Sequence, residues 1–198
     1  MADGLGKHMG HGQILDLVAA GLGLDGVQED HLVQNAVLNA LDSGAGQNAV
    51  GSAGVNLLGT ANLDQQRLYR QVYQRLGIRY GIVTSVDGYD EISLTGNFKV
   101  VYNDEEHIYQ PIEFGMELLQ SEDLYGGATL EEAKAIFDAV LENRSTLAQK
   151  NVVLINSAFA IHVIEQEKSF QECLSIARES LESGKALNAL KKYVELNS

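Results

Sequence analysis

The sequence is poor in residues that cross-link a chain, stiffen it or give it positive charge. Its 198 residues include one cysteine, one proline, no tryptophan and 14 lysines and arginines, against 27 aspartates and glutamates, for a formal net charge of −13. With Cys173 alone no intramolecular disulfide can form, which suits a reducing cytoplasm. The shortage of basic residues argues against a nucleic-acid or anionic membrane surface, because neutralising phosphates takes clustered lysine and arginine.

Targeting segments are not evident either. No apolar run approaches the ~20 residues that cross a bilayer. The first residues, Met1–His8, lack the basic region and following apolar region of a secretory signal. We therefore expect a cytoplasmic protein. We also expect one substantial core, because a chain of this length buries roughly 70% of its unfolded surface.

The composition changes sharply near residue 66. From His8 to Gln66 there is no Lys, Arg, Pro, Cys, Phe, Tyr or Trp. Such a restricted alphabet favours a separate origin, foreign or engineered, for a Gly/Ala/Leu-rich segment at residues 1–56, with an α/β region at 57–198. Within the first segment, Gln13–Ala20 and Gln28–Leu41 have the apolar pattern of helices, and the latter places leucine, valine and alanine on one face.

The second part alternates strand-like and helix-like stretches, which is typical of an α/β fold. Strands are expected near 55–60, 78–86 and 98–102, a turn at 103–107 and an irregular stretch at 108–125. Helices are expected at about 62–76, from 130, and at 147–164, 170–181 and 185–196. Two of them begin with capping-box patterns, Thr129 with Glu132 and Ser169 with Glu172. The prediction is a partial, mostly parallel sheet flanked by helices, with an α-helical N-terminal segment.

An acidic pair follows the strand expected at 78–86. Asp87-Gly88 forms a turn, and Asp90 and Glu91 come directly after it. In open α/β sheets, ligands bind outside the carboxyl ends of the strands, so two carboxylates there, near Ser93 and Thr95, suit a hard cation such as Mg²⁺. The alternative is a solvated acidic turn, which the spacing alone favours.

Five blocks of sequence carry a resemblance to a known family. In order and spacing they resemble the C-terminal half of anthranilate phosphoribosyltransferase, and the resemblance covers the chain from Leu57 to Ser198. The blocks are Asn62–Tyr69, Asp87–Gly96, Asp123–Gly127, Ala148–Val153 and Ser180–Leu187.

The resemblance implies a function, a fold and a metal site. The family makes phosphoribosyl-anthranilate from anthranilate and phosphoribosyl pyrophosphate (PRPP) in tryptophan biosynthesis. Its fold is a small helical domain plus a larger α/β domain, usually in a homodimer. The family's acidic pair binds Mg²⁺ together with the pyrophosphate, a role that carries over to Asp90 and Glu91. No catalytic or substrate-binding residue is assigned beyond that pair.

The sequence also departs from the family. The family's Gly-Thr-Gly-Gly-Asp phosphate loop has no counterpart, and no arginine precedes Arg67 where the anthranilate-binding segment would lie. Three interpretations follow: an active phosphoribosyltransferase, a non-catalytic chimeric or truncated scaffold, or an oligomerisation module that pairs through residues 28–41. The missing loop favours a chain without turnover.

Overall fold

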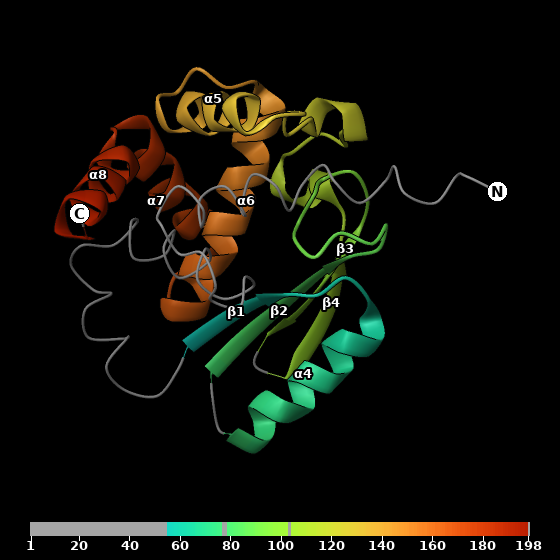
Figure 1. The fold of residues 1–198 in the computed structure, drawn as a ribbon. Helices are drawn as coiled ribbons and strands as arrows, with labels where there is room; N and C mark the ends of the chain where they lie inside the picture. Colours follow the sequence, from blue (N-terminus) through green and yellow to red (C-terminus); the bar gives the residue numbers. More distant parts are fainter. Residues whose placement is uncertain (1–54, 77–78, 103, 198) are drawn as a thin grey trace.

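The structure is a computed structural model that describes residues 55–76, 79–102 and 104–197. The helices expected at 13–20 and 28–41, and with them the α-helical N-terminal segment, lie outside these residues. The described part is an α/β fold, as the sequence predicts. Helices cover both faces of a small sheet (Figure 1).

The sheet is built from short strands in sequence order. Within the described ranges it has four strands in the order β1-β2-β3-β4. The first two pair in parallel and the other two pairings are antiparallel. The strands are β1 (Val55–Gly59), β2 (Arg79–Ser85), β3 (Phe98–Tyr102) and β4 (Glu105–Tyr109).

The partial sheet flanked by helices is confirmed, but the described sheet is mixed where a mostly parallel one was expected. The difference follows from the connections. Helix α4 (Leu63–Leu76) carries the chain from β1 to β2, and such a crossover permits parallel pairing. No helix separates β2 from β3 or β3 from β4, so each chain return makes an antiparallel neighbour.

The turn expected at 103–107 is wrong over most of its length, because strand β4 begins at Glu105. The chain reverses just before Glu105, and Asp104 there has φ 70, a conformation that short polar side chains tolerate. Four of the five β4 residues are exposed, so the strand lacks the alternation that marks a half-buried strand. The stretch expected to be irregular contains two short 3-10 helices, η1 (Pro111–Phe114) and η2 (Ser121–Leu124).

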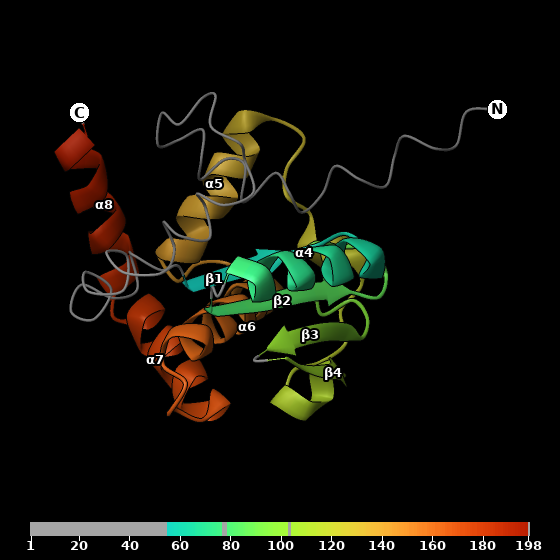
Figure 2. The same ribbon diagram turned by 90° about the horizontal axis from the view of Figure 1, so that it is seen from below.

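Alternation along the inner strands divides the core between two faces. Leu57, Val83 and Val100 belong to a large cluster, whereas Leu58, Ile82 and Val101 belong to a smaller one. The smaller cluster packs against α4 through Tyr73 and Tyr80. Figure 2 shows α4 alongside β1 and β2, with α6 and α7 on the other side.

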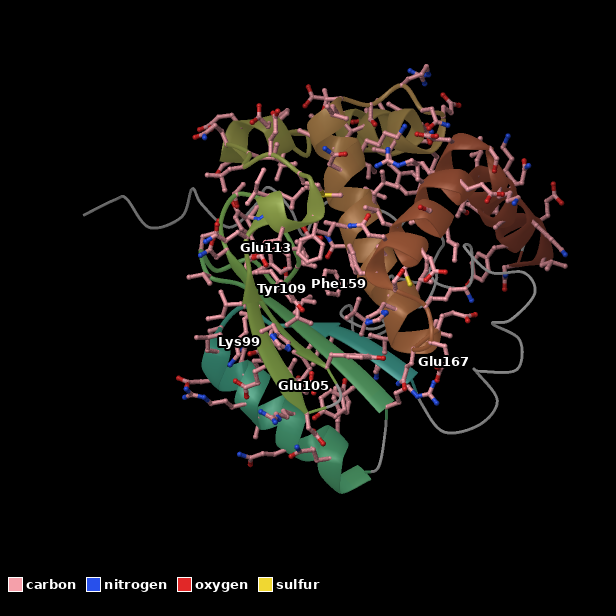
Figure 3. All side chains as sticks on the ribbon, turned by 180° about the vertical axis from the view of Figure 1, so that it is seen from behind. Lys99, Glu105, Tyr109, Glu113, Phe159 and Glu167 are labelled. Carbon is pink, nitrogen blue, oxygen red and sulfur yellow. The ribbon has the colours of Figure 1, made fainter. Side chains whose placement is uncertain are left out.

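Helix α6 (Leu147–Ile164) fills the large cluster. The sequence offers Ser145 or Thr146 as its start, and the cap is Thr146. Half of its residues are buried inside the fold. By length and composition it could cross a membrane, but here it packs against β1, β2 and α7. Phe159 faces Tyr109 of β4, with ring centroids 6.2 Å apart (Figure 3).

The remaining helices match their expected limits closely. They are α5 (Leu130–Leu141), α7 (Phe170–Glu182) and α8 (Lys185–Asn197). Ser169 and Glu172 form the predicted capping box. At α5, Thr129 caps the helix, but the Glu132 carboxylate accepts from the N–H of Ala128 instead of closing a box. Cys173 is fully buried, and burial raises the pKa of its thiol, as suits a packing residue.

The sequence predicts an apolar stripe on α4 formed by Leu68, Tyr69, Val72, Tyr73 and Leu76, but the buried face of the helix is different. Tyr73 is buried, but Leu68 is 60% exposed and Val72 39% exposed. Gln66 is buried instead, and its amide donates to the hydroxyl of Thr84 at 2.9 Å. The buried face of α4 therefore includes a polar contact with β2.

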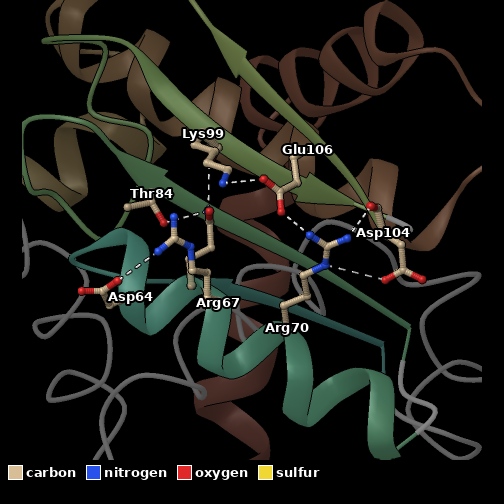
Figure 4. Close-up of polar contacts among 8 residues, drawn as sticks. Asp64, Arg67, Arg70, Thr84, Lys99, Asp104 and Glu106 are labelled. Carbon is tan, nitrogen blue, oxygen red and sulfur yellow. Dashed lines mark hydrogen bonds and ion pairs between the residues drawn. The ribbon is translucent and has the colours of Figure 1, made fainter.

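An ionic cluster joins α4 to the β3–β4 hairpin (Figure 4). Arg70 pairs with the Glu106 carboxylate and donates to the main-chain oxygen of Asp104 at 2.6 Å. Lys99 pairs with the other side of Glu106 at 2.6 Å. The Tyr80 hydroxyl donates to the Asp104 carboxylate at 2.6 Å. These contacts fix the edge hairpin to the helix.

We expect Arg70→Gln to lower the Tm by roughly 2–4 °C, because it removes contacts of one side chain to two residues of the hairpin. Arg67→Gln is the matched control. Arg67 pairs with Asp64 of its own helix, at 3.3 Å and well exposed to solvent, so its loss should change the Tm by less than about 2 °C. Thermal unfolding followed by circular dichroism measures both. Equal Tm values for the two variants would show that the Arg70 contacts do not hold the hairpin to α4.

Candidate metal-binding site

The predicted acidic pair lies in the loop that leaves the carboxyl end of β2. The loop begins with a tight turn, in which Gly88 has φ 98 and donates its N–H to the oxygen of Ser85 at 3.1 Å. The N–H of Ser85 donates to the oxygen of Tyr89 at 3.0 Å. Asp90 and Glu91 follow directly, so the structure places them where the sequence predicted.

The loop also crosses the carboxyl end of β1. A Cβ on Gly59, the last residue of β1, would lie 1.5 Å from the main-chain oxygen of Asp90. Only glycine permits this approach. Since β1 and β2 are parallel, their carboxyl ends meet at one edge, and the acidic pair lies at that edge.

Hydroxyl groups hold the loop from inside. Ser85 donates its hydroxyl to the main-chain oxygen of Glu91 at 2.6 Å. The Ser93 hydroxyl lies 3.1 Å from that of Ser85 and 2.7 Å from that of Thr95, which donates to Asp87. Ser93 and Thr95, expected among the oxygen groups of the site, thus take part in the internal hydrogen bonds of the loop.

Core packing anchors the other end of the acidic pair. Ile92 and Leu94 are fully buried in the large cluster. Asn156 of α6 accepts the N–H of Ile92 at 3.0 Å and donates to its oxygen at 2.9 Å. The loop is thereby tied to β1, to β2 and to α6.

The two carboxylates have different surroundings. Asp90 is exposed, whereas Glu91 is only 8% exposed. Burial, and then the charge of Asp90, raises the pKa of Glu91 to about 8. Among the residues that the structure describes, no side chain donates a hydrogen bond to the Glu91 carboxylate, and no basic side chain pairs with it. A buried carboxyl without a partner is costly unless something neutralises it.

These donors fit Mg²⁺. The ion prefers carboxylate oxygens and commonly takes one or two of them, with water and substrate phosphates completing its shell. Over the described ranges no three His, Cys, Asp or Glu side chains gather into a cage. The pair is therefore suited to a cation that arrives with a phosphate ligand, and less to a structural metal.

Comparisons with known proteins agree with this architecture. The sequence profile of the glycosyl transferase family, a/b domain, matches residues 48–187. An anthranilate phosphoribosyltransferase of Phocaeicola vulgatus is 60% identical over 142 residues, which are 72% of this chain and 43% of that protein. The chain thus spans less than half the length of that curated relative.

Solved structures share the fold. Anthranilate phosphoribosyltransferase from Saccharomyces cerevisiae, in complex with PRPP and Mg, has a TM-score of 0.66 at 22% identity, over 73% of this chain and 41% of that one. The enzyme from Thermus thermophilus has a TM-score of 0.68 at 19% identity, over 98% of this chain and 75% of that one.

The fold is thus that of the α/β domain of a glycosyl transferase, with an acidic pair at the carboxyl edge of its sheet. The chain belongs to the glycosyl transferase family, a/b domain. The resemblance to anthranilate phosphoribosyltransferases over the C-terminal part of the chain is confirmed.

Two features of the site were not predicted from the sequence. The close approach of Gly59 to Asp90 and the bond from Asn156 to Ile92 join residues far apart in the chain. One signal for Asn156 was present, because it is a large polar residue within the apolar stretch of 152–164. Buried polar side chains in such a helix are bonded to something.

We expect Gly59→Ala to destabilise the fold by about 1–3 kcal/mol or more, because the new methyl group would overlap the Asp90 backbone. Gly96→Ala is the control, since its Cβ would lie 3.3 Å from the carboxylate tip of Asp87, which can move aside. Urea unfolding measures both, and an alanine tolerated equally at the two positions would contradict the close approach.

Glu91→Gln should stabilise the metal-free protein at high pH. The carboxyl has a folded pKa of about 8 against an ordinary 4.5, so the folded state holds a proton that the unfolded state has released between those values. Stability contributed by the protonated form is therefore lost as pH rises through about 8. The variant should gain on the order of 1–3 kcal/mol at pH 9 and nothing at pH 4.5.

Urea titrations in a chelator-containing buffer at several pH values measure this gain. Glu131→Gln is the control, because Glu131 is exposed on α5. A Glu91→Gln gain that does not depend on pH would show that burial does not perturb this carboxyl.

Proposed function

We propose that this chain supplies the metal-binding site of an enzyme that transfers phosphoribosyl from PRPP to anthranilate. Family membership and the likeness to anthranilate phosphoribosyltransferases support the reaction class. The yeast relative in complex with PRPP and Mg supports the substrate and the ion. Mg²⁺ at Asp90 and Glu91, and anthranilate as acceptor, are part of this proposal.

The observation that carries the proposal is the unpartnered, buried Glu91 beside the exposed Asp90. A solvated acidic turn would leave both carboxylates in water, but Glu91, in the loop that crosses the end of β1, is only 8% exposed. Burying a carboxylate with no donor has no benefit for folding. A bound cation would give this arrangement a use.

Within this proposal each residue has a separate task. Asp90 and Glu91 hold the ion, while Gly59 and Ser85 keep the loop close to the strand ends. When bound, Mg²⁺ would offset the charge of the departing pyrophosphate.

A second candidate is a folded scaffold without turnover, whether chimeric or truncated. The absence of any counterpart to the Gly-Thr-Gly-Gly-Asp loop favours it, because backbone N–H groups at such loops and helix N-termini bind phosphate. The division into a segment at 1–56 and an α/β region at 57–198 belongs with this candidate. Cytoplasmic location, a homodimer and pairing through residues 28–41 stay predictions.

Calorimetric titration of Mg²⁺ and PRPP into the protein tests the proposal. We expect binding that needs both components and that weakens about tenfold or more in Asp90→Asn and in Glu91→Gln. Glu131→Gln, an exposed acid on α5, should bind as the unchanged protein does.

An assay for product from anthranilate separates the two candidates. Binding with turnover supports the enzyme, and binding without turnover supports the scaffold. If no Mg²⁺-dependent heat is measured, the protein has no metal site at Asp90 and Glu91 under either candidate function.

A further inference from the structure

Asn156 is an isolated polar contact between the central helix and the loop of the acidic pair. It lies half-buried on α6, among neighbours such as Val152 and Ile155 that belong to the large apolar cluster. Its partner Ile92 is 64 positions away in the sequence and follows Glu91 directly. The contact therefore links the position of α6 to the position of the acidic pair.

The hydrogen bonds of Asn156 use its amide almost completely. The oxygen accepts the N–H of Ile92 at 3.0 Å, and the nitrogen donates to the oxygens of Ile92 and Val152, both at 2.9 Å. Exchanging the amide oxygen and nitrogen would set an oxygen against two carbonyl oxygens, so one orientation is enforced. Both main-chain groups of Ile92 are thus held by a single side chain.

The other constraints on the pair come from different elements. Ser85 of β2 holds the main-chain oxygen of Glu91 at 2.6 Å. Gly59 of β1 lets the main-chain oxygen of Asp90 approach the strand end. Asn156 reaches the loop from α6, which packs on the sheet face away from α4. Consecutive peptide groups of the loop therefore bond to β2 and to α6 and approach β1 closely.

We propose that Asn156 is a positioning residue, which sets the placement of the Asp90 and Glu91 carboxylates for a cation by gripping the Ile92 peptide from α6. This inference rests on the proposed Mg²⁺–PRPP function of the same site. Residues that orient metal ligands through hydrogen bonds commonly change metal affinity by 10–100-fold when they are replaced.

Two variants test the role. Asn156→Ala removes the grip. Asn156→Gln keeps the amide but lengthens it by one carbon, about 1.5 Å, so it retains hydrogen-bonding capacity while displacing the loop. Val163→Ala is the matched control, because Val163 is buried on the same helix and contacts the start of β2 near Gly81, away from the loop.

The first measurement is calorimetric affinity for Mg²⁺ with PRPP, alongside the Tm of each variant. We expect at least about tenfold weaker binding in both Asn156 variants and less than about twofold change in Val163→Ala, even where the Tm loss is the same. Asn156 variants that bind as tightly as the unchanged protein would overturn the proposal.

The second measurement needs no ligand and so stays decisive if the proposed function fails. Amide hydrogen exchange should speed up at Ile92 and its loop neighbours more than at Val83 in both Asn156 variants. In Val163→Ala the two sites should change together. Equal acceleration at Ile92 and Val83 in the Asn156 variants would overturn the positioning role. If the unchanged protein binds no PRPP, the proposed function falls, and hydrogen exchange alone decides whether Asn156 fixes the loop.

Discussion

Helix α6 packs its buried side chains against one face of β1, β2 and β3, and both the core and the candidate site depend on this contact. The helix is apolar on nearly every side because it has a sheet on one flank and α7 on another. A helix in that position can fix a loop at the sheet edge with one polar side chain. The rest of its surface supplies the burial that holds the helix still.

The loop between β2 and β3 combines this apolar anchoring with an unfavourable charge. Ile92 and Leu94 are inserted into the core, and the residue before them, Glu91, is drawn under the surface with them. Its raised pKa is the electrostatic consequence of that packing. Folded proteins retain such costs at functional sites, where stability is sacrificed for chemistry. A cation at the proposed site would offset this cost at Glu91.

Much of this architecture was predictable because its signals are local. Thr146 and Ser169 mark helix starts through hydrogen bonds within one turn, and the limits of α6 and α7 followed. The position of the acidic pair followed from the apolar run of β2 and the Asp87-Gly88 turn. Strand β4 was missed because an exposed edge strand has no apolar alternation to read.

Other features depend on contacts between distant residues, which periodicity does not reveal. The buried face of α4 carries Gln66, which bonds to Thr84, while Leu68 lies exposed, so the apolar pattern of the helix does not reveal this face. The grip of Asn156 on Ile92 and the fit of Gly59 against Asp90 have the same character. Local chemistry locates the carboxylates, and tertiary contacts decide which of them is buried.

The strong negative charge of the chain bears on how it could bind a polyanion. Many described basic side chains are already paired: Arg70 and Lys99 with Glu106, and Lys150 with Glu182. Within the described residues none of them pairs with the acidic loop, so that loop repels a phosphate on its own. A divalent cation reverses this sign locally, because it brings two positive charges to a pair of carboxylates and leaves coordination positions for phosphate oxygens. In the proposed site, phosphate binding would therefore depend on the metal.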